Sequence, residues 1–262
     1  MRAAAPPLRI PALALGLAAT LAAALGPAAG CARPEPGDGV VHAAVAANFA
    51  APFADVGRAF EAATGQRVAV SAGSTGALYA QVVAGAPFEV FLAADEERPR
   101  LLVEAGLAVA DSRFTYARGR LVLWSPGRPG IRPGDLGEPG FGRVALANPA
   151  TAPYGAAARE ALERLGLWRA VEPRAVYGSD VGKAFLFVAT GNAAGGLVAR
   201  SQLTAEQARE GWPVPQELHR LLDQQAVLLT AAAGDEGARA LLAFLRGEAA
   251  RALLVEHGYG VD

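Results

Sequence analysis

From Val40 onward the sequence alternates short apolar runs with amphipathic stretches, and this alternation restricts the chain to folds made of repeated β-α-β units. The first apolar run, residues 40–46, predicts a strand. The next large apolar residues, Phe49, Phe53, Val56 and Phe60, recur at intervals of four, three and four. They therefore share one face of a helix, which is expected to end at the glycine that follows at position 65.

The same reasoning divides the chain into two α/β series. The first continues with strands at 67–71 and 88–93 and helices at 77–84 and 95–104. The second has strands at 121–124, 144–147, near 175 and at 196–199, with helices at 155–165 and 181–190. A strand at 225–230 is expected to return to the first series, where helices at 236–246 and 248–257 pack. We therefore expect two α/β lobes with mixed, mostly parallel sheets, joined by a hinge with two chain crossings.

These elements assign residues 40–120 plus 226–262 to lobe 1 and residues 121–225 to lobe 2. They are preceded by a signal peptide at 1–31 and a polar, Pro/Gly-rich tether at 32–39. The sequence is 52% hydrophobic and 19% charged, a composition that supports packed cores and excludes a disordered chain. Because 24 Lys and Arg are balanced by 25 Asp and Glu, no basic field exists to bind nucleic acid, and any bound anion must be held by local contacts.

The N-terminal segment is typical of a secretory signal. Arg2 and Arg9 precede an uncharged, mostly apolar run over residues 10–25. A membrane-spanning helix needs about 20 apolar residues, and this run is shorter and is broken by Gly26 and Pro27. We therefore expect an exported protein whose signal is removed.

Cys31 is the single cysteine, so no disulfide can form within the chain. It ends the segment Ala28-Ala29-Gly30-Cys31, which resembles a lipoprotein processing box except that Ala28 stands where leucine is usual. Two outcomes follow: acylation of Cys31, or cleavage nearby with Cys31 removed or left free. The mature protein is expected in the periplasm or on the outer face of the cell membrane, touching the membrane only through such a lipid anchor.

Four strand-to-helix turns, two in each predicted lobe, carry the residues best suited to bind a ligand. They lie at 46–49, 73–76, 148–155 and 178–182. Ligands of open α/β sheets bind beyond the carboxyl ends of the strands, where free backbone N–H groups and the positive ends of helix dipoles converge. None of these turns supplies Lys or Arg, a pattern that suits a fully deprotonated oxyanion, which only accepts hydrogen bonds.

Plain helix capping competes with ligand binding at each turn, because Asn, Ser, Thr and Asp are ordinary N-cap residues. Asp180 is the one acid near these turns, and a capping role is favoured for it. Other chemistries fail on spacing: residues 73–76 lack the leading glycine of a serine nucleophile elbow, and residues 178–183 are one residue short of a phosphate loop. The three histidines are far apart in sequence and have no cysteine partners, which disfavours a zinc site.

Longer motifs run from the first predicted strand to the C-terminal region. In chain order they are VAANF at 45–49, GSTGALYAQ at 73–81, GAPFEVFLAADE at 85–96, SRFTYA at 112–117, NP at 148–149, APYG at 152–155, VGKA at 181–184 and QQAV at 224–227. Together they resemble the periplasmic molybdate-binding proteins of ABC transporters. The resemblance implies a type II periplasmic-binding fold, capture of molybdate or tungstate between the lobes, and delivery to a membrane permease with its ATPase. It implies no enzyme activity, no cofactor and a monomer.

The resemblance also implies a set of ligand positions. In this sequence they are Ala47, Asn48, Ser74, Thr75, Ala94, Tyr154 and the backbone amide of Val181. Ala47 replaces a hydroxyl residue found in some members, and Ala199 stands where others have a ligand tyrosine, a role that Tyr154 takes in one subgroup. Two alternatives stay open at this point: a binder of another tetrahedral oxyanion such as sulfate or thiosulfate, and an exported hydrolase. The choice between molybdate and tungstate also stays open.

Overall fold

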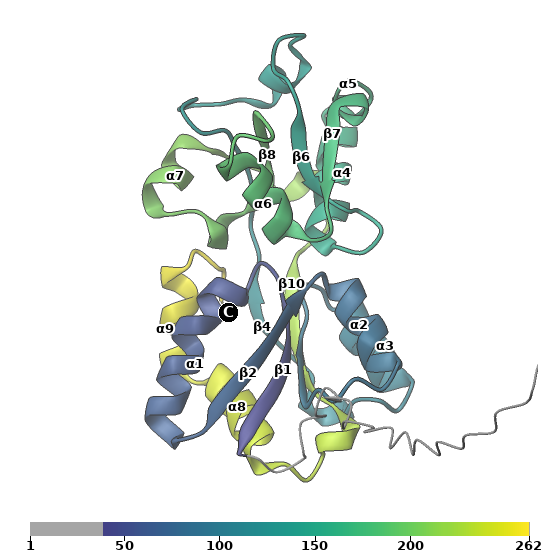
Figure 1. Ribbon diagram of the computed structural model, residues 1–262, viewed down its shortest axis with the longest axis vertical. Helices are drawn as coiled ribbons and strands as arrows, with labels where there is room; N and C mark the ends of the chain where they lie inside the picture. The colour runs from purple at the N-terminus through teal and green to yellow at the C-terminus, as the bar shows by residue number, and fades with distance from the viewer. Residues whose placement is uncertain (1–38, 262) are drawn as a thin grey trace, which may run out of the picture. The chain divides into compact units, whose positions relative to one another are not determined.

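The computed structural model describes residues 39–261. The signal at 1–31, its Cys31 and all but the last residue of the tether lie outside the described residues. The described part is built on two five-stranded sheets, which Figure 1 shows one above the other. Both sheets are mixed and carry helices around them, so the predicted fold class is confirmed.

The first sheet has the strand order β2-β1-β3-β10-β4. Its strands are β1 (Val40–Ala46), β2 (Arg67–Gly73), β3 (Val90–Leu92), β4 (Phe114–Arg118) and β10 (Asp223–Leu228). The strands β2 and β3 run parallel to β1, whereas β10 runs antiparallel to both β3 and β4. We call this sheet and the helices that pack on it lobe 1.

Helices cover both faces of the first sheet (Figure 1). On one face lie α1 (Ala50–Thr64), α8 (Glu236–Arg246) and α9 (Glu248–Glu256), and on the other α2 (Thr75–Val83) and α3 (Glu97–Glu104). Successive residues of β1 serve the two faces: Ala43 and Val45 belong to the core formed with Phe53, whereas Ala44 belongs to the core formed with Leu78. This two-sided burial explains why β1 is apolar at every position except His42.

The second sheet has the order β7-β6-β8-β5-β9. Its strands are β5 (Leu121–Trp124), β6 (Val144–Ala147), β7 (Ala175–Gly178), β8 (Gly195–Ala199) and β9 (Trp212–Pro213). The helices of this half are α4 (Pro153–Arg164), α5 (Trp168–Val171), α6 (Val181–Ala189) and α7 (Ala205–Glu210). We call this second sheet with its helices lobe 2.

The chain passes between the sheets twice. The first crossing follows β4 at Gly119, and the second leads into β10, which belongs to the first sheet from Asp223 onward. The backbone N–H of Gly119 donates to the carbonyl oxygen of Leu222 at 2.9 Å, so the two crossings are hydrogen-bonded to each other. We therefore place the end of lobe 2 just before Asp223.

Most predicted elements are present, with boundary shifts of one or two residues. The strands at 40–46, 121–124 and 144–147 and the helix at 236–246 have the expected bounds, and the helix from Ala50 ends as expected with Gly65 at φ 73°. The strands β4 and β9 and the short helices α5 and α7 were not predicted. The pairing that defines β4 is with β10, more than 100 residues later in the sequence, and no local pattern reveals such a partner.

Candidate functional site

A small cavity of about 10 Å³ lies where turns of both lobes meet. All seven ligand positions implied by the sequence line it, and five further residues complete the wall: Ala46, Gly73, Ala152, Pro153 and Asp180. The four turns converge because each follows the carboxyl end of a strand: β1 and β2 in lobe 1, and β6 and β7 in lobe 2. Ala199, at the end of β8, is not among the lining residues.

Two of the lining residues cap helices. Ser74 is the N-cap of α2, and its hydroxyl oxygen accepts from the backbone N–H of Ala77 at 3.3 Å. Asp180 caps α6: its carboxylate accepts from the N–H of Lys183 at 2.9 Å and from the hydroxyl of Ser179 at 2.9 Å. The capping role expected for Asp180 is confirmed, and both of its oxygens are occupied by donors.

Backbone amides are also available at this cavity. Within residues 39–261, no acceptor pairs with the backbone N–H of Asn48, which follows β1, or of Val181, which begins α6. Val181 also stands at the positive end of its helix dipole. Each amide is therefore a donor in position for an anion.

The hydroxyl of Thr75 is oriented by the strand beside it. Its Oγ1 accepts from the backbone N–H of Ala94 at 3.0 Å, and Thr75 itself is buried. An oxygen that accepts in this way keeps its own proton free to donate elsewhere. The amide of Ala94 is thus committed to Thr75 and orients that hydroxyl.

Tyr154 supplies a phenol from lobe 2. It lies in the first turn of α4 after Pro153, a position that favours a helix start, and its side chain is buried. The phenolic oxygen accepts from Nε2 of Gln224 at 3.2 Å. Burial raises the pKa of the Tyr154 phenol well above its usual range, so the group remains a protonated donor throughout the physiological pH range.

The side chain of Asn48 is committed to the protein. Its Nδ2 donates to Oε1 of Gln224 and to the hydroxyl of Tyr259, each at 2.9 Å. Both protons of the amide are used, so only the backbone of Asn48 can donate into the cavity. Its carbonyl oxygen accepts from Tyr259 at 3.0 Å and from Ser201 at 2.9 Å.

Sequence reasoning missed the buried polar residues behind this cavity, namely Tyr116, Ser201, Gln224 and Tyr259. Tyr116 bonds Gln224, and the contacts of the other three residues with Asn48 or Tyr154 span 70 to 211 positions. Gln224 is completely buried in a strand that is otherwise mostly apolar. A buried amide must find partners, and that expectation is the one signal that could have marked Gln224 as part of a network.

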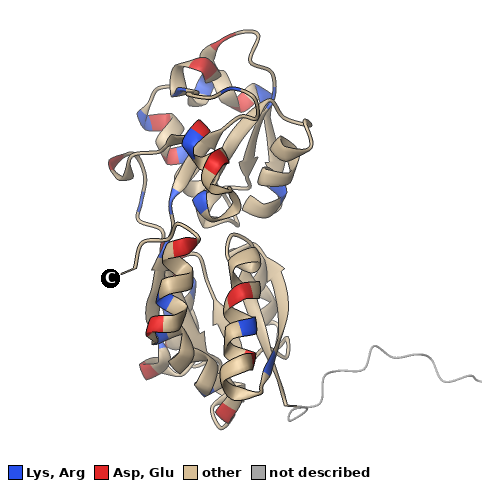
Figure 2. Ribbon diagram, turned by 90° about the vertical axis from the view of Figure 1, so that its left-hand side faces the viewer, with Lys and Arg blue, Asp and Glu red and all other residues tan. Residues whose placement is uncertain are grey.

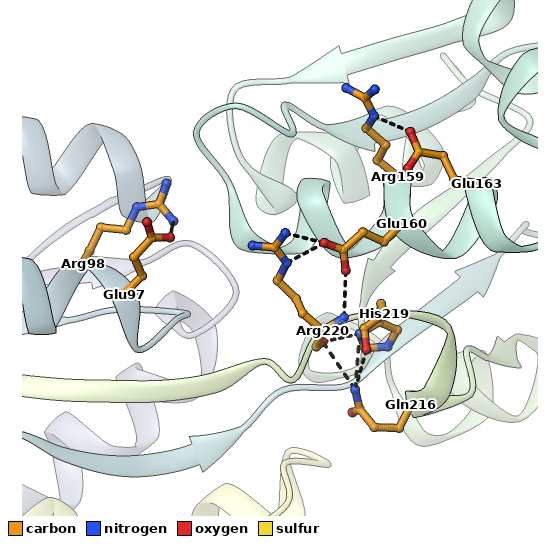
Figure 3. A network of polar contacts seen from close by, with 8 residues as sticks. All are labelled: Glu97, Arg98, Arg159, Glu160, Glu163, Gln216, His219 and Arg220. Carbon is orange, nitrogen blue, oxygen red and sulfur yellow. Dashed lines mark hydrogen bonds and ion pairs between the residues drawn. The ribbon is translucent and has the colours of Figure 1, made fainter.

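Several charged side chains that line a second, larger cavity are paired with one another. Charges of both signs are spread over the helices of both lobes (Figure 2). A larger cavity of about 660 Å³ is lined by Arg98 and Asp95 of lobe 1 and by Arg220 and Glu160 of lobe 2, among others. Arg220 binds Glu160 through its backbone N–H at 2.8 Å and its Nε at 2.6 Å, and Figure 3 shows this pair opposite Glu97. Arg98 donates to Asp95 at 2.7 Å.

Residues 39–261 provide neither a cluster of metal ligands nor a membrane-spanning helix. No group of three or more His, Cys, Asp or Glu side chains is arranged to hold a metal ion there. In that same part of the chain, no helix combines the length and apolar character needed to cross a membrane.

The fold, with two α/β lobes and a donor-lined cavity at their junction, is that of a solute-binding protein. The family model of bacterial extracellular solute-binding proteins matches residues 41–260, so the chain belongs to that family. The molybdate-binding protein of Rhodobacter capsulatus is 45% identical over 223 residues, which cover 84% of this chain and 88% of that protein. The molybdate-binding protein of Azotobacter vinelandii is also 45% identical, with coverages of 85% and 90%.

Solved structures agree with this assignment. The periplasmic molybdate-binding protein of Azotobacter vinelandii superimposes with a TM-score of 0.80 at 36% sequence identity, covering 85% of this chain and 99% of that one. The sulfate-binding protein of Mycobacterium tuberculosis has a TM-score of 0.68 at 16% identity, a likeness that extends to the fold alone.

Proposed function

We propose that this chain captures a tetrahedral oxyanion, molybdate or tungstate, in the cavity between its lobes and delivers it to an ABC permease with its ATPase. The observation that carries the proposal is the convergence of donors from both lobes on one small cavity whose only acid, Asp180, is already occupied by donors. A dianion without protons requires donors alone, and such a wall supplies them.

The proposed donors are five. They are the backbone N–H groups of Asn48 and Val181 and the hydroxyls of Ser74, Thr75 and Tyr154. The remaining two ligand positions act differently: Ala47 contributes a small side chain that leaves room, and Ala94 orients Thr75 through its amide.

The donor count accounts for tight binding without a lysine or arginine. Hydrogen bonds to charged groups contribute about 1.5 to 3 kcal/mol each, so five give roughly 7 to 15 kcal/mol. Nanomolar affinity corresponds to about 12 kcal/mol. The low dielectric of a closed interlobe cavity keeps these bonds at the strong end of that range.

The small volume of the cavity disfavours larger organic ligands. At about 10 Å³ it has no room for a sugar, an amino acid or a peptide in this conformation. The relatives at 45% identity are named for molybdate, which favours this oxyanion over sulfate or thiosulfate. A hydrolase has no support in the site, because no nucleophile with a base and an orienting partner lines the cavity.

The setting of this function is proposed on the same grounds. The chain acts outside the cytoplasm as a monomer, in the periplasm or at the outer face of the membrane, and Cys31 is the candidate for lipid attachment. The N-terminal pattern of Arg2, Arg9 and the apolar run supports export.

Titration calorimetry of the mature protein with molybdate, tungstate, sulfate and phosphate tests the proposal. Molybdate and tungstate are expected to bind at least about a hundredfold, or about 2.7 kcal/mol, more tightly than sulfate. Equal affinity for sulfate would refute the assignment of the ligand, and absence of binding by all four anions would refute the oxyanion site itself.

A further inference from the structure

We propose that Gln224 is a positioning residue that turns the hydroxyl proton of Tyr154 into the cavity and so makes the site selective for oxyanions that carry no proton. This inference rests on the proposed function. Gln224 lines neither the small nor the larger cavity. It lies behind Tyr154 and contacts the ligand site through two residues, Tyr154 and Asn48.

Gln224 joins the two lobes' contributions to the site. It is completely buried on β10, at a bulge where the pairing of β10 with β4 shifts register. Bulges re-aim side chains next to functional sites. Its Oε1 accepts from Nδ2 of Asn48 at 2.9 Å and lies 3.0 Å from the hydroxyl of Tyr116, and its Nε2 donates to the phenolic oxygen of Tyr154 at 3.2 Å.

These contacts set the direction of the Tyr154 proton. A phenol that receives a proton from Gln224 cannot donate its own proton to the same nitrogen. Within residues 39–261 no acceptor is paired with the Tyr154 O–H, and Tyr154 lines the cavity. The free proton is therefore directed at the position where the anion is proposed to lie.

Close packing at Gly119 independently indicates that the pair is held in place. A Cβ atom at Gly119 would lie 2.6 Å from Nε2 of Gln224 and 3.0 Å from Cζ of Tyr154, and closer still to the Tyr154 hydroxyl. The backbone of the first hinge crossing thus leaves the amide and the phenol no space to separate on that side. The φ angle of Gly119 is not positive, so its backbone conformation does not itself require glycine. A side chain is therefore excluded here by these contacts.

This orientation determines which anions the site favours. With the amide in this orientation, Tyr154 presents a donor, and each carboxylate oxygen of Asp180 already accepts one hydrogen bond, from Ser179 or from Lys183. A hydrogen phosphate ion would bring a proton for which Tyr154 in this orientation offers no acceptor, at the cost of an unmade hydrogen bond in a buried site. Without Gln224 the phenol could rotate and accept that proton.

The first test replaces Gln224 by methionine, which keeps the length of the side chain and removes both of its polar contacts. Molybdate affinity is expected to fall about fivefold to tenfold, and the ratio of phosphate to molybdate affinity is expected to rise. Gln225→Met is the matched control: this neighbouring glutamine bonds Arg113 at 2.8 Å and Thr115 at 3.1 Å, away from the cavity, and its loss should leave both affinities within about twofold. Tighter molybdate binding by Gln224→Met would mean that Tyr154 donates to Gln224 and would overturn the proposal.

A double-mutant cycle with Tyr154→Phe separates positioning from general stability. If Gln224 acts through the phenol, Gln224→Met should change molybdate affinity by less than about twofold in the Tyr154→Phe background. Equal effects of Gln224→Met in both backgrounds would show that Gln224 only supports the fold. Thermal melting of each anion-free variant identifies any that fail to fold.

Gln224→Glu provides a pH-dependent affinity measurement, which would not be expected if Gln224 had only a structural role. When its carboxyl group is ionised it accepts the Tyr154 proton, and when protonated it can donate as the amide does, so the affinity ratio of wild type to variant should fall as pH is lowered. The ionisable neighbours are the phenols of Tyr116, Tyr154 and Tyr259, whose pKa values burial raises, and Asp95, whose pKa burial also raises. These groups are common to both proteins and largely cancel in the ratio.

A ratio that does not change with pH would contradict the proposal. Failure of the proposed function and failure of this inference would give different results. If wild-type protein binds neither molybdate nor tungstate, the proposed function fails and this inference falls with it. If wild-type protein binds and the cycle shows no coupling, only the role of Gln224 is refuted.

Discussion

The hydroxyl of Ser201 in lobe 2 donates to the backbone carbonyl oxygen of Asn48 in lobe 1 at 2.9 Å, and this bond is buried. A second direct contact joins the lobes at the backbone, where the N–H of Gly76 donates to the carbonyl oxygen of Thr151 at 2.9 Å. A Cβ atom at Gly76 would lie 2.8 Å from that oxygen, so the close approach depends on glycine. Closure of the lobes therefore has its own hydrogen bonds in addition to those proposed for the anion.

Removal of the Ser201 hydroxyl should weaken the closed state. For Ser201→Ala we expect the molybdate dissociation rate to rise about fivefold, because one buried hydrogen bond of about 1 kcal/mol is lost between the lobes. Stopped-flow competition with excess tungstate measures this rate. An unchanged dissociation rate would mean that the bond forms equally well in the open protein.

Gly119→Ala should disrupt the site without a change in polar groups. The new methyl group would overlap the space taken by the Tyr154 hydroxyl and Nε2 of Gln224, so molybdate affinity should fall by at least about tenfold. Gly234→Ala is the control, because a Cβ atom there meets no atom within 4 Å. Calorimetry on both variants checks the prediction, which fails if the two behave alike.

Tyr154→Phe should separate binding from folding. The ring and its packing are kept while one charge-assisted donor is removed, so affinity should fall by about 1.5 to 3 kcal/mol, more than tenfold. The melting temperature of the anion-free protein should stay nearly unchanged. If the variant instead loses stability and keeps its affinity, Tyr154 belongs to the fold and lobe 2 contributes through the amide of Val181.

His219 should make stability depend on pH. Burial lowers the pKa of its imidazole, and its Nδ1 lies 2.6 Å from the carbonyl oxygen of Arg220 in the network of Figure 3. Below about pH 6.5 the unfolded chain binds a proton at this residue more readily than the folded chain, so stability is lost as pH falls from about 6.5 toward the lowered pKa. Between about pH 7.5 and about pH 5, the melting temperature of His219→Gln should therefore fall less than that of wild type. Equal losses would show that His219 titrates alike in both states.

The strand-to-helix turns show what local sequence can predict. The apolar spacing of Phe49, Phe53 and Phe60 and the glycine after α1 are local signals, and the helix and its end lie where they were expected. The turns at the ends of β1, β2, β6 and β7 could be selected because parallel strands bring their carboxyl ends to one edge of a sheet. Six of the seven ligand positions implied by the family resemblance lie in these turns, whereas Ala94 follows β3, and all seven line one cavity.

What could not be predicted is set by contacts between distant residues. The commitment of the Asn48 side chain to Gln224 and Tyr259 depends on partners 176 and 211 positions away. The sequence identifies Asn48 as a ligand position without separating its side chain from its backbone, whereas the structure leaves only its backbone amide available. The strand β4 was likewise missed, because its role depends on its pairing with β10.

A crystal structure of the mature protein with tungstate tests the central claim most directly, because anomalous scattering locates the metal atom without ambiguity. We predict one strong anomalous peak in the small cavity, with oxygens of the anion within hydrogen-bond distance of the Tyr154 hydroxyl and of the amides of Asn48 and Val181. A peak in the larger cavity beside Arg220 and Arg98, with none between the four turns, would contradict it.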